Sequence, residues 1–243
     1  GVGKAAGATL TLIAEEFPRE QSIRLAHLAD IIETSMLKRI AHGRPFGVAI
    51  LAEGIALRLD QEDFKKTMSH VERDEHGHIR LGELNLDEVL VGLIKERFQA
   101  RGDKITVVAK NIGYELRCAP PIPFDIEYTR NLGYGAVDYL RSLRAEGRPD
   151  VGAMITFQEG EMVPMPFGSF SDATTGRTRV REVNVASESF KVALQYMIRL
   201  ERQDLEDPTR LAAIAKAAKM TAEAFAARYG YLVGMGNAPV AST

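Results

Sequence analysis

The chain has 243 residues, of which 45% are hydrophobic and 26% are charged, and its formal net charge at pH 7 is −2. This composition is typical of a soluble globular protein with one large or two small domains, and it excludes attraction to nucleic acid or an anionic membrane through overall charge. No apolar run reaches the roughly 18 residues of a membrane span. A single cysteine cannot form an internal disulfide or a cysteine-rich metal site, so we expect a cytoplasmic protein.

The first half of the chain alternates between strand and helix patterns. Apolar, β-branched runs predict buried strands over residues 8–14, 46–54 and 103–111. Apolar side chains at helical spacing predict helices over residues 20–41, 85–102 and 125–144. This repeated strand–helix order predicts an α/β fold: a mostly parallel sheet with helices on both faces.

The second half predicts a hairpin followed by helices. Two alternating runs within residues 151–167 flank Glu159 and Gly160, which are typical of a hairpin turn. Asp207 and Thr221 are typical N-terminal caps. The expected helices cover residues 187–202, 207–220 and 221–232.

Polar side chains follow each of the three predicted strands where it ends. Glu15 comes after the first strand, Glu53 after the second, and Tyr114, Glu115 and Arg117 after the third. In open parallel sheets, ligands bind beyond the carboxyl ends of the strands. The Arg117 guanidinium offers a planar fork of donors to a phosphate or carboxylate, Tyr114 adds a hydroxyl donor, and the prolines that follow stiffen the loop. The pattern predicts a binding site at this edge.

Each of these residues also has an ordinary structural interpretation. A carboxylate after a strand, such as Glu15, is more often a solvated group or a helix N-cap than a ligand-binding group. Glu53 before Gly54 fits a turn, and Arg117 fits an ion pair with Glu115 equally well. These residues by themselves leave both interpretations open.

Other residues that often carry chemistry are interpreted as structural. His70, His76 and His78 lie in the polar stretch 60–82, which we expect to be a solvated surface loop rather than a metal site. Near Cys118, no histidine or helix N-terminus is placed to make the thiol a thiolate, so we interpret it as a packing residue.

Four stretches together resemble the second half of a phosphofructokinase: "LTLIAEEFP", "GVAILAEG", "IGYELRCAPPIPFDIEYTRNLGYGAVDYL" and "GAMITFQEGEMVPMPF". The third is the most specific, because family members place a Gly-aromatic-x-x-Arg turn there, then Phe-Asp and a helix with Leu-Gly-x-x-Ala. The stretch "TGRTRVREVNVASESFKVALQYMIRLERQDLEDP" resembles the extended tail of the pyrophosphate-dependent group. The resemblance covers nearly the whole chain and implies the C-terminal portion of a pyrophosphate-dependent 6-phosphofructokinase.

The resemblance implies a role for five residues. The glutamate that binds the sugar phosphate in the family matches Glu15, although Ala14 stands where the family usually has proline. The turn that binds fructose 6-phosphate matches four residues, Tyr114, Glu115, Leu116 and Arg117. Many relatives have glycine or glutamine in place of Leu116, which matters little if this residue contributes only its backbone. A guanidinium and a phenol hydroxyl suit a phosphate that carries about two negative charges.

Three motifs of the family are absent from this sequence: the Gly-Gly-Asp donor loop, the Pro-Lys-Thr-Ile-Asp-Asn-Asp segment with the general base, and the Met-Gly-Arg substrate motif. In the family all three precede the strand with which this chain begins. We therefore expect a fragment that is inactive alone and holds neither catalytic residues nor metal ligands. In the complete enzyme, the resemblance implies in-line phosphoryl transfer to the 1-hydroxyl of the sugar, with Mg²⁺ on the donor oxygens and an aspartate as the base.

The resemblance also implies an arrangement of the chain and a place in metabolism. Residues 1–150 are expected to form the α/β sugar-phosphate-binding part, and residues 151–243 a hairpin and helical extension packed on it. A glycolytic, reversible enzyme that is at least a homodimer is implied, since the family builds its site where two subunits meet. An ATP-dependent kinase and a non-catalytic sugar-phosphate-binding module are the alternatives, because the residues that select the donor lie in the absent motifs.

One apolar stripe bears on assembly. It lies at helical spacing within residues 187–202 and consists of Phe190, Leu194, Met197 and Ile198. Such a stripe fits a contact between subunits and packing within one subunit equally well.

Overall fold

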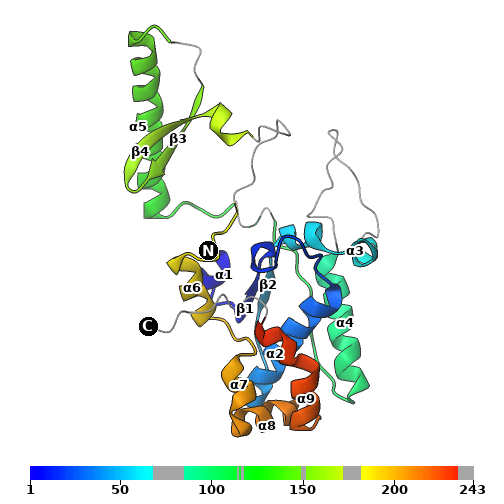
Figure 1. Cartoon of the computed structure of the whole chain (residues 1–243). Coiled ribbons are helices and arrows are strands. Elements are labelled where there is room, and N and C mark those ends of the chain that lie inside the picture. Colours follow the sequence, from blue (N-terminus) through cyan, green and yellow to red (C-terminus); the bar gives the residue numbers. More distant parts are fainter. Residues whose placement is uncertain (68–84, 114, 116–117, 149–151, 172–181, 235–243) are drawn as a thin grey trace. The chain divides into compact units, whose positions relative to one another are not determined.

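The computed structural model describes residues 1–67, 85–113, 115, 118–148, 152–171 and 182–234 (Figure 1). The chain forms two compact units. Unit 1 consists of Gly1–Asn111 and Val183–Thr243, and unit 2 consists of Ile112–Glu182. The chain therefore leaves unit 1 once and returns to it.

Unit 1 contains a parallel pair of strands. Strand β1 (Leu10–Leu12) pairs with β2 (Ala49–Leu51), and Thr11 lies opposite Ile50. Helix α2 (Leu25–Ala41) connects the two strands, as the repeated strand–helix pattern predicts. Two of the three predicted strands and the helix between them are confirmed, with strands shorter than predicted.

Residues 103–111, which are predicted to form a third strand, do not pair with another strand among the described residues. The described backbone there has no strand assignment and makes no ladder hydrogen bond with β1 or β2. Its side chains nevertheless alternate as in a strand: Ile105 and Val107 pack against the core, whereas Val108 is exposed. The apolar–polar alternation correctly predicts which side chains face the core, but a ladder also requires backbone hydrogen bonds to a neighbouring strand, which these described residues do not make with β1 or β2. Within the described residues the parallel sheet has two strands, so the fold is a mixture of helices with small sheets.

Helices make up most of the rest of unit 1. They are α1 (Val2–Ala5), α3 (Gln61–Thr67), α4 (Leu86–Ala100), α6 (Glu188–Gln195), α7 (Arg202–Glu206), α8 (Pro208–Ala217) and α9 (Ala222–Tyr229), with 3₁₀ turns η1 (Ala14–Glu16), η2 (Glu53–Arg58) and η6 (Gly230–Gly234). Asp207 and Thr221 cap α8 and α9 through their side-chain oxygens, as predicted. The predicted helix over residues 187–202 ends early at Gln195, and Ile198 beyond it donates its backbone N–H to the Thr9 carbonyl at 2.8 Å.

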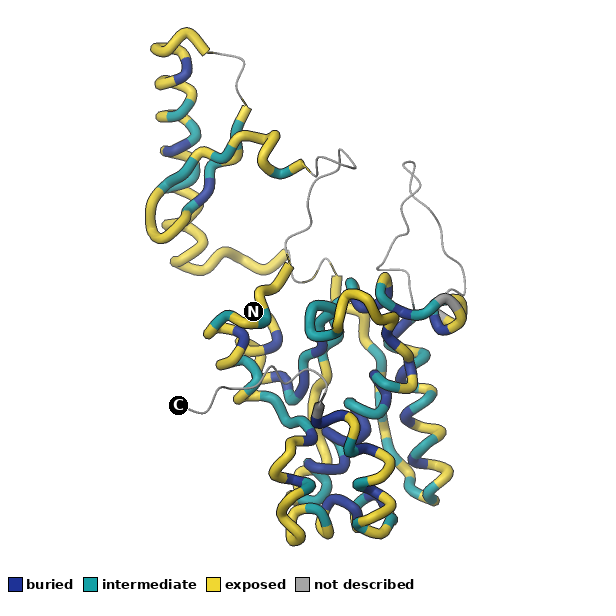
Figure 2. Tube along the Cα trace, in the orientation of Figure 1, coloured by how far each residue is buried: buried dark blue, intermediate teal, exposed yellow. Residues whose placement is uncertain are grey.

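The core of unit 1 surrounds α2, against which α4 and α8 pack. Figure 2 shows buried residues gathered along α2 and the C-terminal helices. The largest fully buried side chains include Leu12, Leu28, Leu37, Ile94, Phe98, Ile214, Phe225 and Tyr229. Residues from both ends of the described chain therefore share one core.

Two clusters of buried charge join α2 to its neighbours. Glu33, whose side chain is 0% exposed, pairs with Arg97 at 2.8 Å and with Arg101, both from the α4 side. On the other side, Lys38 Nζ lies 2.6 Å from Asp204 Oδ2 and 2.7 Å from Glu201 Oε2. The pairing with opposite charges offsets the cost of burying these side chains.

Unit 2 is a helix packed on a hairpin. Helix α5 (Pro123–Ala145) lies against the antiparallel strands β3 (Ala153–Gln158) and β4 (Glu161–Pro166), and the 3₁₀ turn η5 (Phe167–Phe170) follows. The hairpin turns at Glu159 and Gly160, both of which have positive φ, so the predicted hairpin is confirmed.

Candidate functional site

The carboxyl ends of β1 and β2 lie side by side, and each strand runs into a 3₁₀ turn that carries an acidic residue. Glu15 lies on η1 after β1, and Glu53 lies at the start of η2 after β2. The two turns contact each other, and the Ala52 N–H donates to the Leu12 carbonyl at 2.9 Å. The expectation that these two strand ends share one edge is confirmed.

The segment after β1 is held in place by one arginine that the sequence analysis did not single out. The Arg58 guanidinium, at the end of η2, donates to the carbonyl oxygens of Ala14 at 3.4 Å, Phe17 at 3.5 Å, Pro18 at 2.5 Å and Gln21 at 3.3 Å. An arginine suits this task because its planar head carries five donors and always keeps its charge. These hydrogen bonds hold the backbone around Glu15 against η2, the turn that follows β2.

The two neighbouring glutamates of η1 have different surroundings. The Glu16 side chain is 3% exposed and pairs with Arg199 at 2.5 Å, and Glu16 also accepts a hydrogen bond from its own loop, the Ile13 N–H, at 3.1 Å. Arg199 in turn donates to the Thr11 carbonyl of β1 at 2.6 Å. Glu16 therefore holds the turn, which leaves Glu15 as the glutamate available to a ligand.

Glu15 is half-buried and has a single described partner. Its Oε1 accepts a hydrogen bond from the Val183 backbone N–H at 2.9 Å. Its other oxygen, Oε2, accepts no hydrogen bond from the described residues. Glu53, by contrast, is exposed at the start of its turn, which fits the turn-residue interpretation.

The second group of predicted site residues belongs to unit 2. Tyr114, Leu116 and Arg117 lie outside the described residues. Glu115 accepts the Gly113 N–H at 3.0 Å, so its carboxylate folds back onto its own loop. Glu15 and Glu115 thus fall in separate units.

The loop leads into α5 and ends with a local cap. Asp125 accepts the Ile122 N–H at 2.9 Å, and Pro123 occupies the first helical position. Cys118 is exposed, so its interpretation as a packing residue is wrong. Neither the cysteine itself nor the prolines that follow it in the sequence indicate that the side chain is exposed.

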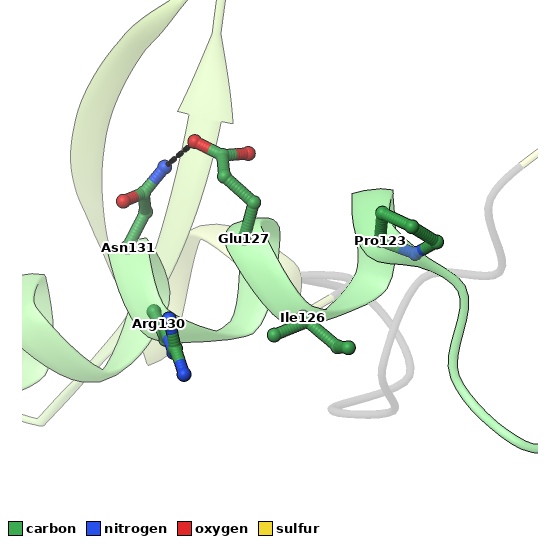
Figure 3. Close-up of a pocket in the computed structure, with 5 residues that line it drawn as sticks. All are labelled: Pro123, Ile126, Glu127, Arg130 and Asn131. Atoms are coloured by element: carbon green, nitrogen blue, oxygen red, sulfur yellow. Dashed lines mark hydrogen bonds between the residues drawn. The ribbon is translucent and has the colours of Figure 1, made fainter.

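A shallow hollow of about 320 Å³ lies along the first turns of α5 (Figure 3). Its lining includes Pro123, Ile126, Glu127, Arg130 and Asn131. The Asn131 side-chain amide donates to Glu127 at 2.5 Å, whereas Arg130 makes no hydrogen bond or ion pair with the described residues. The sequence analysis did not identify this hollow, because no strand end or motif marks it.

Among the described residues, no group of three or more His, Cys, Asp or Glu side chains could hold a metal ion, and no helix is long and apolar enough to cross a membrane. His70, His76 and His78 lie outside the described residues.

Burial lowers the pKa of His27, although the nearby negative charge of Asp30 acts in the opposite direction. The His27 ring packs between Phe17 and Tyr231.

Comparison with curated proteins finds relatives along almost the whole chain. The pyrophosphate–fructose 6-phosphate 1-phosphotransferase of Thermotoga maritima is 47% identical over 230 residues, which cover 94% of this chain and 54% of that protein. The protein of the same name from Naegleria fowleri is 43% identical over 240 residues, which cover 96% and 54%. Subunit beta 2 of the Arabidopsis thaliana enzyme is 24% identical over 177 residues, 55% of this chain and 31% of that subunit.

No family model matches the chain. The chain spans about half the length of the two curated relatives that it matches along nearly its whole length. The resemblance to the pyrophosphate-dependent phosphofructokinases is confirmed by these two similarities.

Proposed function

We propose that this chain is the C-terminal, sugar-phosphate-binding portion of a diphosphate-dependent 6-phosphofructokinase. The complete enzyme transfers a phosphoryl group reversibly from diphosphate to fructose 6-phosphate and forms fructose 1,6-bisphosphate, a reaction of glycolysis. The observation that carries this proposal is the identity of 47% and 43%, over nearly the whole chain, to two proteins named for that reaction. Both names specify pyrophosphate, which favours diphosphate over ATP as the donor.

In this proposal Glu15 and the turn at residues 114–117 each contribute to substrate binding. Glu15 accepts hydrogen bonds from sugar hydroxyls through its free oxygen, at an edge of the parallel pair where ligands are expected. Arg117 and Tyr114 bind the 6-phosphate through charge-assisted hydrogen bonds, with Glu115 and Leu116 completing the turn. The support for Glu15 is its position and its unoccupied oxygen, and the support for the turn is the resemblance.

The finer fold is also part of the proposal. We propose that β1 and β2 belong to a larger, mostly parallel sheet of the complete protein, with helices on both faces. The alternating exposure of residues 103–111 supports this proposal. Alternation of this kind is typical of a strand that has one face packed on the core.

The groups that perform the chemistry are expected outside this chain. We propose that the complete enzyme uses Mg²⁺ to neutralise the oxygens of diphosphate and an aspartate to take the proton of the 1-hydroxyl. The role of this chain's residues is then to bind and orient the sugar phosphate. We further propose a cytoplasmic homodimer or larger assembly.

A coupled assay of the complete protein tests the proposal. It measures fructose 1,6-bisphosphate formed from fructose 6-phosphate with diphosphate and then with ATP. We expect turnover with diphosphate and none with ATP, and none with either donor for the purified 243 residues alone. Turnover with ATP alone would point to the ATP-dependent alternative. Binding of fructose 6-phosphate without turnover by the complete protein would point to the non-catalytic module.

A further inference from the structure

We propose that the backbone N–H of Val183 orients the Glu15 carboxylate toward the sugar phosphate, which makes Val183 a positioning residue of the site. This inference rests on the proposed function, because it concerns how one of the proposed substrate-binding groups is held. The two atoms belong to the same unit and lie 2.9 Å apart, although the residues are 168 positions apart in the chain.

The hydrogen bond divides the work of the carboxylate between its two oxygens. Oε1 accepts from Val183, and Oε2 accepts nothing from the described residues. A glutamate has three side-chain torsions, so a free one samples many orientations. Because one oxygen is held, the other points in a defined direction before a ligand arrives, and less ordering is needed on binding.

The acceptor side of this contact is rigid. Glu15 lies on η1, and the buried side chain of its neighbour Glu16 is paired with Arg199. Arg58 binds four carbonyl oxygens of the same segment. The backbone of Glu15 is therefore fixed relative to β1 and η2.

The donor side is anchored to the same strand. From Val183 the chain reaches Ser187, which caps α6 by accepting the Phe190 N–H at 3.3 Å. Phe190 is buried, and beyond α6 the Ile198 N–H donates to the Thr9 carbonyl just before β1. The segments that carry the donor and the acceptor are thus both held against β1. Such support fixes the position of the hydrogen bond before a ligand binds.

A backbone donor explains why no side-chain pattern reveals this role. Any residue except proline at position 183 can supply the N–H, so the position has no characteristic residue type. The same property supplies the test, because proline removes the donor and alanine keeps it.

The experiment compares Val183→Pro with Val183→Ala in the complete protein. For Val183→Pro we expect the KM for fructose 6-phosphate to rise about three- to tenfold, the size of one lost hydrogen bond, with little change in the KM for diphosphate. Val183→Ala is expected to behave as the unchanged protein. Thermal unfolding of both variants reports on the fold, and a merely structural role would lower the unfolding temperature without moving this KM.

Combination with Glu15→Ala separates the two proposals. We expect Glu15→Ala to raise the KM for fructose 6-phosphate, and Val183→Pro to add nothing in that background. If Glu15→Ala has no effect on this KM, the proposed site itself fails. If Glu15→Ala has its effect but Val183→Pro matches Val183→Ala, or if Val183→Pro acts further without Glu15, the positioning role is overturned while the site stands.

Proline also restricts the backbone, so a second variant is needed if Val183→Pro does not fold. Replacement of Val183 by the corresponding α-hydroxy acid turns one amide into an ester and removes the same N–H without the proline ring. The same rise in the KM for fructose 6-phosphate is expected. An ester variant that folds and binds the sugar phosphate normally would overturn the inference.

Discussion

Ion pairs of equal length differ in their surroundings in this protein. Lys38 and Asp204 lie 2.6 Å apart with side chains 9% and 2% exposed, whereas Lys191 and Glu188 lie 2.6 Å apart near solvent. Removal of Lys38 leaves the buried Asp204 carboxylate with only the longer pair to Arg210 at 3.9 Å, and the loss of a buried partner costs about 3–5 kcal/mol. An exposed pair contributes about 0.5 kcal/mol or less.

We therefore predict that Lys38→Ala lowers the free energy of unfolding by about 3–5 kcal/mol, while the control Lys191→Ala changes it by less than about 0.5 kcal/mol. Urea unfolding of the two variants measures both values. Equal effects of the two substitutions would show that Lys38 is not buried with its partners as described.

Tyr229 links stability to alkaline pH. Its side chain is buried, and burial together with the charge of Glu33 raises the pKa of Tyr229 to about 12. The unfolded chain has a tyrosine pKa of about 10. The contribution of this group to stability is therefore fully present below pH 10 and is lost as the pH rises through the folded value.

We predict that the unfolding free energy of the unchanged protein falls more steeply between about pH 10 and 12 than that of Tyr229→Phe. The hydroxyl lies beside the Glu33 carboxylate but makes no hydrogen bond of good geometry with the described residues, so the substitution itself costs little at pH 7. Other groups titrate in the same range, and the difference between the two proteins isolates Tyr229. Parallel pH profiles would refute this assignment.

The site residues that could be predicted are those whose own type and position carry a signal. Glu15 follows a strand and is an acid, so both the pattern and the resemblance point to it. Arg58, Arg199 and Val183 act on backbone groups or partners far away in the sequence, and no local pattern marks such contacts. Whether Arg117 binds the phosphate stays a prediction.

Helix α5 contains two glycines in opposite surroundings. A Cβ added at Gly135 would lie 1.9 Å from Met162 Sδ and 3.0 Å from Ile155 Cγ2 of the hairpin, whereas a Cβ at Gly133 would meet nothing within 4 Å. Gly135 thus permits the helix to approach the hairpin closely, while Gly133 only weakens the helix.

We predict that Gly135→Ala destabilises unit 2 by about 1–3 kcal/mol through overpacking, and that Gly133→Ala stabilises it by about 0.5–1 kcal/mol through helix propensity. Hydrogen exchange of the α5 amides reports on this unit separately. The packing described here would be contradicted if both substitutions stabilised the helix alike.

Elements defined by local signals were predictable, and elements that depend on distant partners were not. The caps Asp207 and Thr221 and the turn at Glu159 are short-range features, and all three are confirmed. The early end of α6 at Gln195 has no stop signal, because it follows from the pairing of Ile198 with Thr9 beside β1. For the same reason, alternation over residues 103–111 predicts an extended backbone but not a ladder.

Elements that are neighbours in the sequence do not always belong to the same compact unit. Helices α7, α8 and α9 were expected to form part of an extension with the hairpin. In unit 1, α8 packs on α2, and α7 and α9 pack against α8, while α5 with the hairpin forms unit 2. Composition and periodicity do not reveal which buried faces meet. The domain boundary that the sequence analysis predicts at residue 150 stays a prediction for the complete protein.

The apolar stripe within residues 187–202 does not support the proposed assembly. Phe190 is buried, and Leu194, Met197 and Ile198 are half-buried within the chain itself. Within unit 2, however, α5 leaves Ile126, Val137 and Leu140 exposed on the side opposite Gly135. Such an apolar row favours a contact that covers it.

We predict that the complete protein sediments with the mass of a dimer or larger, and that dilution to monomer weakens the binding of fructose 6-phosphate. Sedimentation velocity combined with binding measurements over a concentration series tests both parts. A monomer that binds the sugar phosphate at full affinity would contradict the assembly.

The proposed binding of the sugar phosphate by this chain is tested most directly by Arg117→Ala in the complete protein, with Arg148→Ala, at an exposed arginine of the same unit, as the control. Loss of a charge-assisted contact to phosphate costs about 1.5–3 kcal/mol, so we predict that Arg117→Ala raises the KM for fructose 6-phosphate about ten- to a hundredfold. The KM for diphosphate and both constants of Arg148→Ala are expected to stay unchanged. An unchanged KM for fructose 6-phosphate in Arg117→Ala would contradict the assignment of this chain as the part that binds the sugar phosphate.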